Sequence, residues 1–281
     1  MIPAAFDYEV AESVEHAIEL LSTKEDPKLL AGGHSLLPLM KFRLARPATL
    51  IDIGRIPGLA GVRDDGDQLV IGALTRHHDL HHDPLVEEHC PLLAYAAGLV
   101  GDSQVRHRGT IGGSLAHGDP ASDLPTIVLT LDAQIIVRGP GGERVIGATD
   151  CFRGFYETAL EPDELIVEVR VPKTGAAGWS YVKFRRRALD WATVGVAALV
   201  EADNGAIGGA RIGLTNMGQV PLRAAAVEQA LAGAAPDSVA AAAEHADAGT
   251  DPPADTAASS DFRRHLARVL TARAVEEALT R

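Results

Sequence analysis

The sequence contains very little cysteine. Only Cys90 and Cys151 occur in 281 residues, and neither belongs to a Cys-x-x-Cys pair. An iron–sulfur cluster or a tetrahedral zinc ion needs about four ligands that converge on one point. The chain therefore cannot hold such a centre by itself, and any such centre must come from a partner.

Basic charge is also scarce. The chain has 26 lysines and arginines against 38 aspartates and glutamates, which gives a formal net charge of -12. A surface of this sign repels nucleic acid and anionic lipid over most of its area. We therefore expect no nucleic-acid partner.

Long apolar runs are missing as well. Residues 1–7 lack a basic segment followed by an apolar stretch, and no run approaches the roughly 18 apolar residues that span a bilayer. The expected location is the cytoplasm. Because 46% of the residues are hydrophobic, the chain can still bury a large core.

Two common catalytic and binding motifs are absent too. No G-x-G-x-x-G run with a later acidic residue occurs, which disfavours the usual dinucleotide site of a doubly wound sheet. No G-x-S-x-G motif occurs either, and no serine has a base at a readable spacing. Simple NAD binding and hydrolase chemistry therefore lose support.

Hydrophobic periodicity predicts a small β-α-β-loop-α-β unit over residues 1–55. Apolar residues recur at helical spacing after Ser13, which is placed as a helix N-cap. The expected strands cover residues 6–8, 28–31 and 49–53, and the expected helices cover residues 14–21 and 36–42.

A second sheet is expected over residues 56–175. An Asp65-Gly66 turn indicates a hairpin, and Gly139-Pro140-Gly141-Gly142 indicates a tight reversal between two strands. A glycine-rich loop is expected over residues 108–118. The other expected elements are strands over 61–63, 68–73, 133–138, 143–146 and 164–171, and helices over 75–82, 92–100 and 121–131.

The segment Pro172–Gly178 reads as a linker, so we place a domain boundary there. The predicted domains are residues 1–175, with subdomains over 1–55 and 56–175, and residues 176–281. The last domain should contain strands over 179–184, 193–202 and 211–216. Its remainder is alanine-rich and should be helical, ending in a helix that carries Phe262 and Leu266.

Gly32-Gly33 lies between a predicted strand and a predicted helix. Glycine allows a close approach of the backbone to a ligand, and free amides at this place can bind phosphate. By itself the pair is a weak signal and is better explained by a strand-to-helix turn that needs a positive φ angle. The second glycine-rich run, Gly109 to Ser114, should supply further free amides and two hydroxyls, so that two loops could hold one diphosphate.

Four histidines, His77, His78, His81 and His82, suggest a metal site at first sight. Adjacent histidines point in different directions on a helix, however, and no carboxylate completes a clear triad. We therefore expect this segment to be an exposed helical turn with a solvated face, which could bind nickel or zinc adventitiously, and we assign no metal ligands.

Three segments together resemble the FAD-binding medium subunits of the molybdenum hydroxylases, the family of xanthine dehydrogenase and aerobic carbon monoxide dehydrogenase. The likeness is greatest to the carbon monoxide dehydrogenase medium subunit and covers nearly the whole chain. The segments are Ala31–Leu36, Thr110–Leu115 and Ala116–Pro125.

The resemblance implies an α+β fold, with a two-subdomain FAD-binding domain of the PCMH type and a C-terminal domain of a small antiparallel sheet with helices. It implies that the two glycine-rich runs clasp the FAD pyrophosphate and that Asp123 bonds to ribityl or ribose hydroxyls. Lys183 would lie near the flavin, and Trp191 would stack on one face where relatives often have tyrosine. Without the resemblance, Lys183 reads as one of a solvated basic cluster with Arg185, Arg186 and Arg187. The implied pyrophosphate residues are Ala31, Gly32, Gly33, His34, Ser35, Leu36, Thr110, Ile111, Gly112, Gly113 and Ser114.

The same resemblance implies an electron relay. A large subunit would carry the molybdenum cofactor, a small subunit would carry two [2Fe-2S] clusters, and the FAD of this chain would pass electrons to a quinone, NAD or oxygen. A dimer of heterotrimers is implied, with a possible contact at a membrane quinone. Two other functions remain open, a stand-alone FAD-dependent oxidase or dehydrogenase and a flavin-free assembly subunit.

Aspartate at either glycine-rich run should exclude the cofactor. We predict that Gly33→Asp or Gly113→Asp abolishes FAD binding, because the side chain adds bulk and repels the diphosphate, while the partner subunits still assemble. The measurement is the flavin content of the purified variant complex. A full complement of flavin would refute the assignment of that loop.

Overall fold

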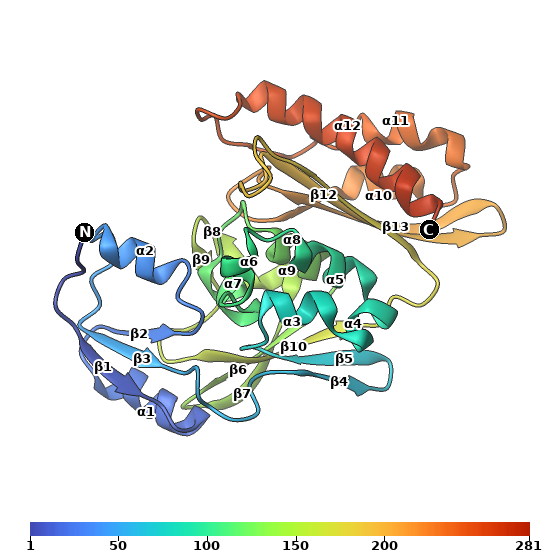
Figure 1. The fold of residues 1–281 in the computed structure, drawn as a ribbon. Coiled ribbons are helices and arrows are strands. Elements are labelled where there is room, and N and C mark those ends of the chain that lie inside the picture. Colours follow the sequence, from blue (N-terminus) through green and yellow to red (C-terminus); the bar gives the residue numbers. More distant parts are fainter.

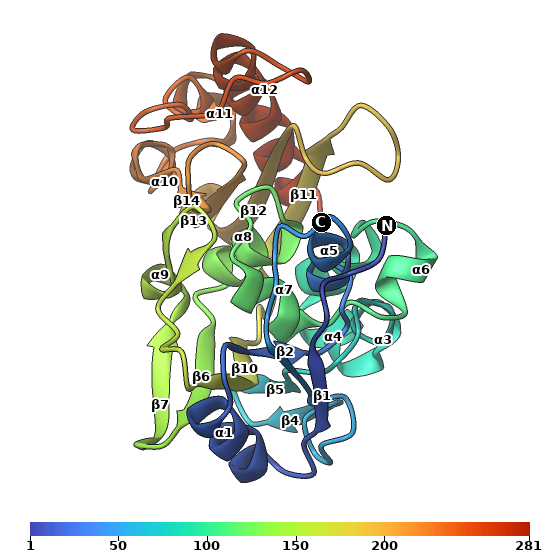
Figure 2. The ribbon, with the colours of Figure 1, turned by 90° about the vertical axis from the view of Figure 1, so that its left-hand side faces the viewer.

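Three main sheets, of three, five and four strands, organise the structure, which is a computed structural model of all residues 1–281. Figure 1 shows the N-terminal unit (blue) beside the five-stranded sheet, with the C-terminal sheet and its helices above them. The view in Figure 2 shows helix α8 directly beneath the C-terminal sheet, so that this helix lies between two sheets.

The N-terminal unit is a parallel sheet in the order β1-β3-β2, with α1 packed beside it. Helix α1 begins after Ser13, whose side chain accepts a hydrogen bond from the amide of His16 at 3.1 Å, which confirms the predicted cap. The elements are β1 (Asp7–Val10), α1 (Val14–Thr23), β2 (Pro27–Leu30), α2 (Leu36–Lys41) and β3 (Thr49–Asp52).

The five-stranded sheet has the order β4-β5-β10-β6-β7 and is antiparallel throughout. Both predicted hairpins are confirmed. The strands are β4 (Val62–Asp65), β5 (Gln68–Gly72), β6 (Gln134–Gly139), β7 (Gly142–Gly147) and β10 (Leu165–Pro172), and a separate pair consists of β8 (Phe152–Gly154) and β9 (Glu157–Thr158).

The second part of the chain also contains seven helices, within residues 77–151. Only three of them were predicted as helices. Helices α4 and α6 were missed because they are too short for a periodic pattern, although Asp83 and Asp102 cap them with their carboxylates. The helices are α3 (His77–His82), α4 (Pro84–His89), α5 (Pro91–Gly98), α6 (Ser103–Arg106), α7 (Ile111–His117), α8 (Asp123–Thr130) and α9 (Ala148–Cys151).

The C-terminal part is an antiparallel sheet in the order β11-β12-β13-β14 with four short or long helices on one side. Strand β13 begins five residues before the predicted start, because Gly208 and Gly209 weaken the apolar pattern there. The elements are β11 (Gly178–Phe184), β12 (Val194–Asp203), β13 (Ala206–Thr215), β14 (Leu222–Arg223), α10 (Ala225–Leu231), η1 (Pro236–Ser238), α11 (Val239–Ala243) and α12 (Ser260–Leu279).

Strand β12 is buried on both faces, which explains its nearly unbroken apolar sequence. Val194, Val196 and Val200 belong to a core shared with α12. Ala197 and Leu199 alternate with them and belong to the core of the second part. The C-terminal sheet is therefore joined to the rest of the chain by a continuous apolar contact. No helix in the structure combines the length and apolar character that crossing a bilayer requires.

The contact between β13 and α8 leaves no room for a methyl group at Gly213. A Cβ atom there would lie 2.1 Å from the Thr130 hydroxyl oxygen and 2.9 Å from a methyl carbon of Thr126. We predict that Gly213→Ala lowers the free energy of unfolding by about 3 kcal/mol through overpacking. Gly209→Ala on the same strand, where the nearest neighbour would be 3.9 Å away, is the matched control in a urea titration. Equal stability of the two variants would contradict this packing.

Candidate functional site

The first glycine-rich run leaves a row of backbone amides without partners. It joins the end of β2 to the start of α2, and Gly33 turns the chain there with a φ of 75°. None of the amides from Ala31 to Leu36 donates a hydrogen bond to another protein atom. Consecutive free amides form a concave donor surface that suits an anionic oxygen. The predicted anion-binding loop therefore has the donors that a diphosphate requires.

The second run differs from the prediction because it is helical. Residues from Ile111 onward form α7, and the Thr110 side chain caps this helix by accepting a hydrogen bond from the Gly113 amide at 3.1 Å. The expected free amides are therefore largely absent. The amide of Ile111 donates to the Thr75 carbonyl and that of Gly112 to the Ala73 carbonyl, at 3.0 and 2.8 Å.

What α7 offers a ligand is different from what a loop would offer. The Ser114 amide donates to the Thr110 carbonyl, as in any helix, so only the Thr110 amide in this run remains unpaired. The hydroxyl groups of Thr110 and Ser114 are the other polar groups. Gly112 is needed for packing, since a Cβ atom there would lie 2.6 Å from the Cβ of Ala73.

The two glycine-rich runs touch each other. A Cβ atom at Gly32 would lie 2.2 Å from the Arg108 carbonyl oxygen and 2.9 Å from the Cα of Gly109. A side chain at Gly32 would therefore separate the two segments. The structure brings together two sequence motifs that lie more than seventy residues apart, as the sequence analysis required.

His77 packs against this junction, a contact that the sequence did not predict. Its amide donates to the Gly109 carbonyl at 3.0 Å, and a Cβ atom at Gly109 would lie 2.8 Å from the imidazole. The side chain is buried, and its Nδ1 atom has no hydrogen-bond partner. Burial lowers the pKa of His77 to about 4, and the charges of Arg106 and His34 act in the same direction.

The expectation of a solvated histidine face is therefore wrong for His77, and it is incomplete for His81, whose Nδ1 lies 3.0 Å from the Ala94 carbonyl. Amphipathic periodicity in a six-residue helix turns every fourth residue toward the core. His78 packs its ring against His82 and His107 instead. The structure contains no group of three or more side chains placed to hold a metal ion.

Asp123 and Lys183 form a buried ion pair at 2.7 Å, in which each side chain is 3% exposed. The other carboxylate oxygen of Asp123 accepts a hydrogen bond from the Tyr181 hydroxyl at 2.6 Å, and Lys183 also donates to the Leu99 carbonyl. Burial raises the pKa of the Asp123 carboxyl, while Lys183 opposes this shift. The Lys183 side chain is thus buried, whereas Arg186 and Arg187, a few residues later, are exposed. The sequence did not distinguish these environments.

Tyr181 was missed by the sequence analysis, although a signal existed. Residues two apart on a strand share a face, so Tyr181 lies on the same face of β11 as Lys183. Trp191 lies in the loop between β11 and β12, where it is 56% exposed. In the chain alone no hydrogen bond connects Trp191 with the two glycine-rich runs.

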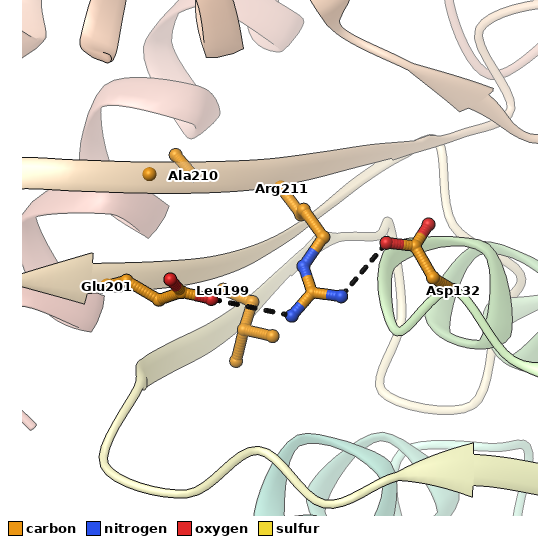
Figure 3. A pocket seen from close by; sticks show the side chains of 6 residues that line it. Asp132, Leu199, Glu201, Ala210 and Arg211 are labelled. Carbon is orange, nitrogen blue, oxygen red and sulfur yellow. Dashed lines mark hydrogen bonds and ion pairs between the residues drawn. The ribbon is translucent and has the colours of Figure 1, made fainter.

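A pocket of about 370 Å³ lies elsewhere, between β12, β13 and the end of α8. Figure 3 shows Arg211 reaching toward Asp132 and Glu201 in this pocket, at 2.9 and 3.8 Å. Its charges are already paired with one another, and none of the predicted site residues lines it. The pocket is therefore a junction between domains and not the candidate site.

The fold is α+β, and the site is an open row of amides packed beside a capped helix, an arrangement that suits an anionic ligand. Comparison with known families makes this more specific. Residues 4–174 match the family described as the FAD binding domain in molybdopterin dehydrogenase, and residues 179–278 match the CO dehydrogenase flavoprotein C-terminal domain.

Individual proteins match the chain over its full length. The carbon monoxide dehydrogenase medium chain of Hydrogenophaga pseudoflava is 43% identical, with 100% of this chain and 99% of that one covered. The 6-hydroxypseudooxynicotine dehydrogenase complex subunit alpha of Paenarthrobacter nicotinovorans is 40% identical, with 100% and 97% covered. The solved carbon monoxide dehydrogenase of H. pseudoflava that lacks the Mo-pyranopterin moiety gives a TM-score of 0.97 at 45% identity, over 100% and 99% of the chains.

The chain therefore belongs to the FAD-binding medium subunits of the molybdenum hydroxylases related to carbon monoxide dehydrogenase, which are parts of multi-subunit oxidoreductases. The family predicted from the sequence, its FAD-binding domain and the α+β fold with a small C-terminal antiparallel sheet are confirmed. The role of each predicted site residue stays a prediction.

The buried His77 gives the chain a specific sensitivity to acid. The His77 pKa is about 4 in the folded chain against an ordinary 6.5, so the unfolded state binds more protons below pH 6.5, and stability is lost as the pH falls from there toward 4. Between pH 7 and 5 we expect wild type to lose about 2 kcal/mol more than His77→Gln in urea titrations. The exposed His245→Gln serves as the control. Parallel losses in all three proteins would rule out a buried neutral His77.

Proposed function

We propose that this chain holds FAD and relays electrons from iron–sulfur clusters of a partner subunit to an external acceptor. The observation that carries the proposal is the row of unpaired amides from Ala31 to Leu36, packed directly against Gly109 and the start of α7. Charge-assisted hydrogen bonds to a diphosphate would satisfy these donors. Bound FAD would supply the redox chemistry, since it exchanges electrons in steps of one or two.

In this arrangement the chain contributes binding groups and fixed charge. The amides of the first run would hold one phosphate group, and the hydroxyls of Thr110 and Ser114 with the Thr110 amide would bind the other. Gly32 supports the proposal because any side chain there would push the two segments apart. The family match over residues 4–174 supports the choice of FAD over other dinucleotides.

Asp123 and Lys183 would act as a fixed pair beside the cofactor. Each carboxylate oxygen has two lone pairs, so Asp123 can accept a hydrogen bond from a ribityl or ribose hydroxyl in addition to those from Tyr181 and Lys183. The Lys183 cation would stabilise the anionic reduced ring through space. Trp191, exposed on its loop, would cover one face of the isoalloxazine.

The partners that fit this function are a large subunit with the molybdenum cofactor and a small subunit with [2Fe-2S] clusters. The names of the relatives support such an assembly, since a medium chain implies a larger and a smaller one. We propose a dimer of these heterotrimers in the cytoplasm, with a quinone, NAD or oxygen as the acceptor; a membrane quinone would place the complex peripherally at the membrane. The two cysteines of this chain are buried and separate, in keeping with clusters on another subunit.

Carbon monoxide is the substrate we propose for the whole complex. The support is the 43% identity to a carbon monoxide dehydrogenase medium chain, although a subunit named for 6-hydroxypseudooxynicotine dehydrogenase is 40% identical. Substrate choice would therefore reside in the large subunit. We also propose the domain division inferred from the sequence, with residues 1–175 binding FAD and residues 176–281 packing on them.

The test is a visible absorption spectrum of the chain purified with whatever binds it, followed by heat release and chromatographic identification of the flavin. We expect FAD together with iron–sulfur absorbance. Matched samples of Gly32→Val should lack flavin, because the side chain would meet the Arg108 carbonyl, while Gly141→Val, in an open turn, should keep it.

Other results would favour other functions. FAD in a lone chain that oxidises a substrate would indicate a stand-alone oxidase or dehydrogenase. An intact complex without flavin would leave only a structural assembly role.

A further inference from the structure

The loop between β11 and β12 is held almost entirely at its ends. Within residues 185–192 the only backbone hydrogen bond joins the Asp190 amide to the Arg187 carbonyl, and the Thr193 amide closes the loop on the Phe184 carbonyl. Arg186, Arg187, Leu189 and Trp191 are exposed. The position of Trp191 therefore depends on what fixes the backbone immediately after it.

Two buried side chains, one directly after β13 and one in α12, donate hydrogen bonds to that backbone. The amide nitrogen of the Asn216 side chain donates to the Ala192 and Thr193 carbonyls, at 2.8 and 3.3 Å. The guanidinium of Arg263, at the start of α12, also donates to the Thr193 carbonyl. Three donor contacts thus converge on two consecutive carbonyl groups that directly follow Trp191.

Asn216 connects the loop to the cofactor-binding part of the chain. Its own amide donates to the Pro120 carbonyl at 2.9 Å, and Pro120 lies between α7 and α8. Asn216 has a φ of 62°, a left-handed conformation that asparagine tolerates better than most residues. This conformation aims its backbone at one domain and its side chain at the loop of the other.

Burying the Arg263 side chain costs free energy because its guanidinium is charged. Its side chain is 1% exposed, yet its only carboxylate partner, Asp255, is 49% exposed, and its Nε atom has no partner. An apolar side chain of similar size commonly stabilises a core as well as a buried charge does. The adjacent Phe262 packs against Phe184 at the other end of the loop, so the start of α12 supports both ends.

We propose that Arg263 and Asn216 are positioning residues for residues 185–192, and that they hold Trp191 where it covers one face of the flavin. The second half of this statement rests on the proposed function, and the first half does not. The consequence is that the C-terminal helix sets the environment of the flavin ring through the loop.

Trypsin tests the first half, because Arg185, Arg186 and Arg187 provide cleavage sites within the loop. We expect Asn216→Gly, which keeps the left-handed backbone and the bond to Pro120, to raise the rate of cleavage at these arginines about tenfold. Arg263→Met should do the same, and Arg263→Lys should lie between it and wild type. The controls are Asn204→Gly, at another left-handed asparagine, and Arg264→Met, next to Arg263 on the same helix.

Fluorescence of the flavin in the purified complex tests the second half. Release of Trp191 should raise the flavin fluorescence of Asn216→Gly to the level of Trp191→Ala, and combining the two substitutions should add nothing further, which a general loss of stability would not produce. Wild-type cleavage rates in folded Asn216→Gly and Arg263→Met would overturn the positioning role. Faster cleavage with unchanged or additive flavin fluorescence would overturn the link to Trp191. A wild-type complex without flavin would refute the proposed function, but the cleavage result would still decide whether Arg263 and Asn216 position the loop.

Discussion

The ion pair between Asp123 and Lys183 fixes the relation between the cofactor-binding part of the chain and its C-terminal sheet. Both groups are nearly inaccessible to water, so separating them would strand a charge in the interior, at a cost of several kcal/mol. Asp123 opens α8, where the helix dipole favours a negative charge, and Lys183 comes from β11. The pair therefore sets where the C-terminal sheet lies relative to α7 and α8.

The site depends on this contact and on which backbone amides already have hydrogen-bond partners within the chain. In α7 nearly every amide is used within the chain, by the Thr110 cap and by the carbonyls of Ala73 and Thr75. Gly32 packs against Arg108 and Gly109, immediately before this helix. The amides of the first run, in contrast, have no hydrogen-bond partner in the chain. In the proposed site the first run would therefore supply most of the amide donors, and the second run would support it and add the Thr110 amide and the hydroxyls of Thr110 and Ser114.

In the proposed arrangement the C-terminal domain acts on the same site from a distance. Strand β12 presents Val196 to α12 and Leu199 to the second part of the chain, so the sheet transmits the position of the last helix to the cofactor side. Asn216 and Arg263 lie where this transmission ends, at the carbonyls beside Trp191. In the proposed electron relay the chain would need no acid or base of its own, and its side chains would act by placing groups and charges.

The amino-acid sequence alone determined the family, the order of most strands and helices and the two glycine-rich runs, because periodicity, turn residues and motif spacing are local properties of the chain. It also excluded metal and cluster chemistry that needs more cysteine. It misjudged α7 as a loop and His77 as exposed, and it could not distinguish Lys183 from the arginines beside it. Those properties depend on which distant backbone and side-chain groups come within a few ångströms, such as Ala73 beneath Gly112 and Asp123 beside Lys183, and only the tertiary structure decides which groups meet.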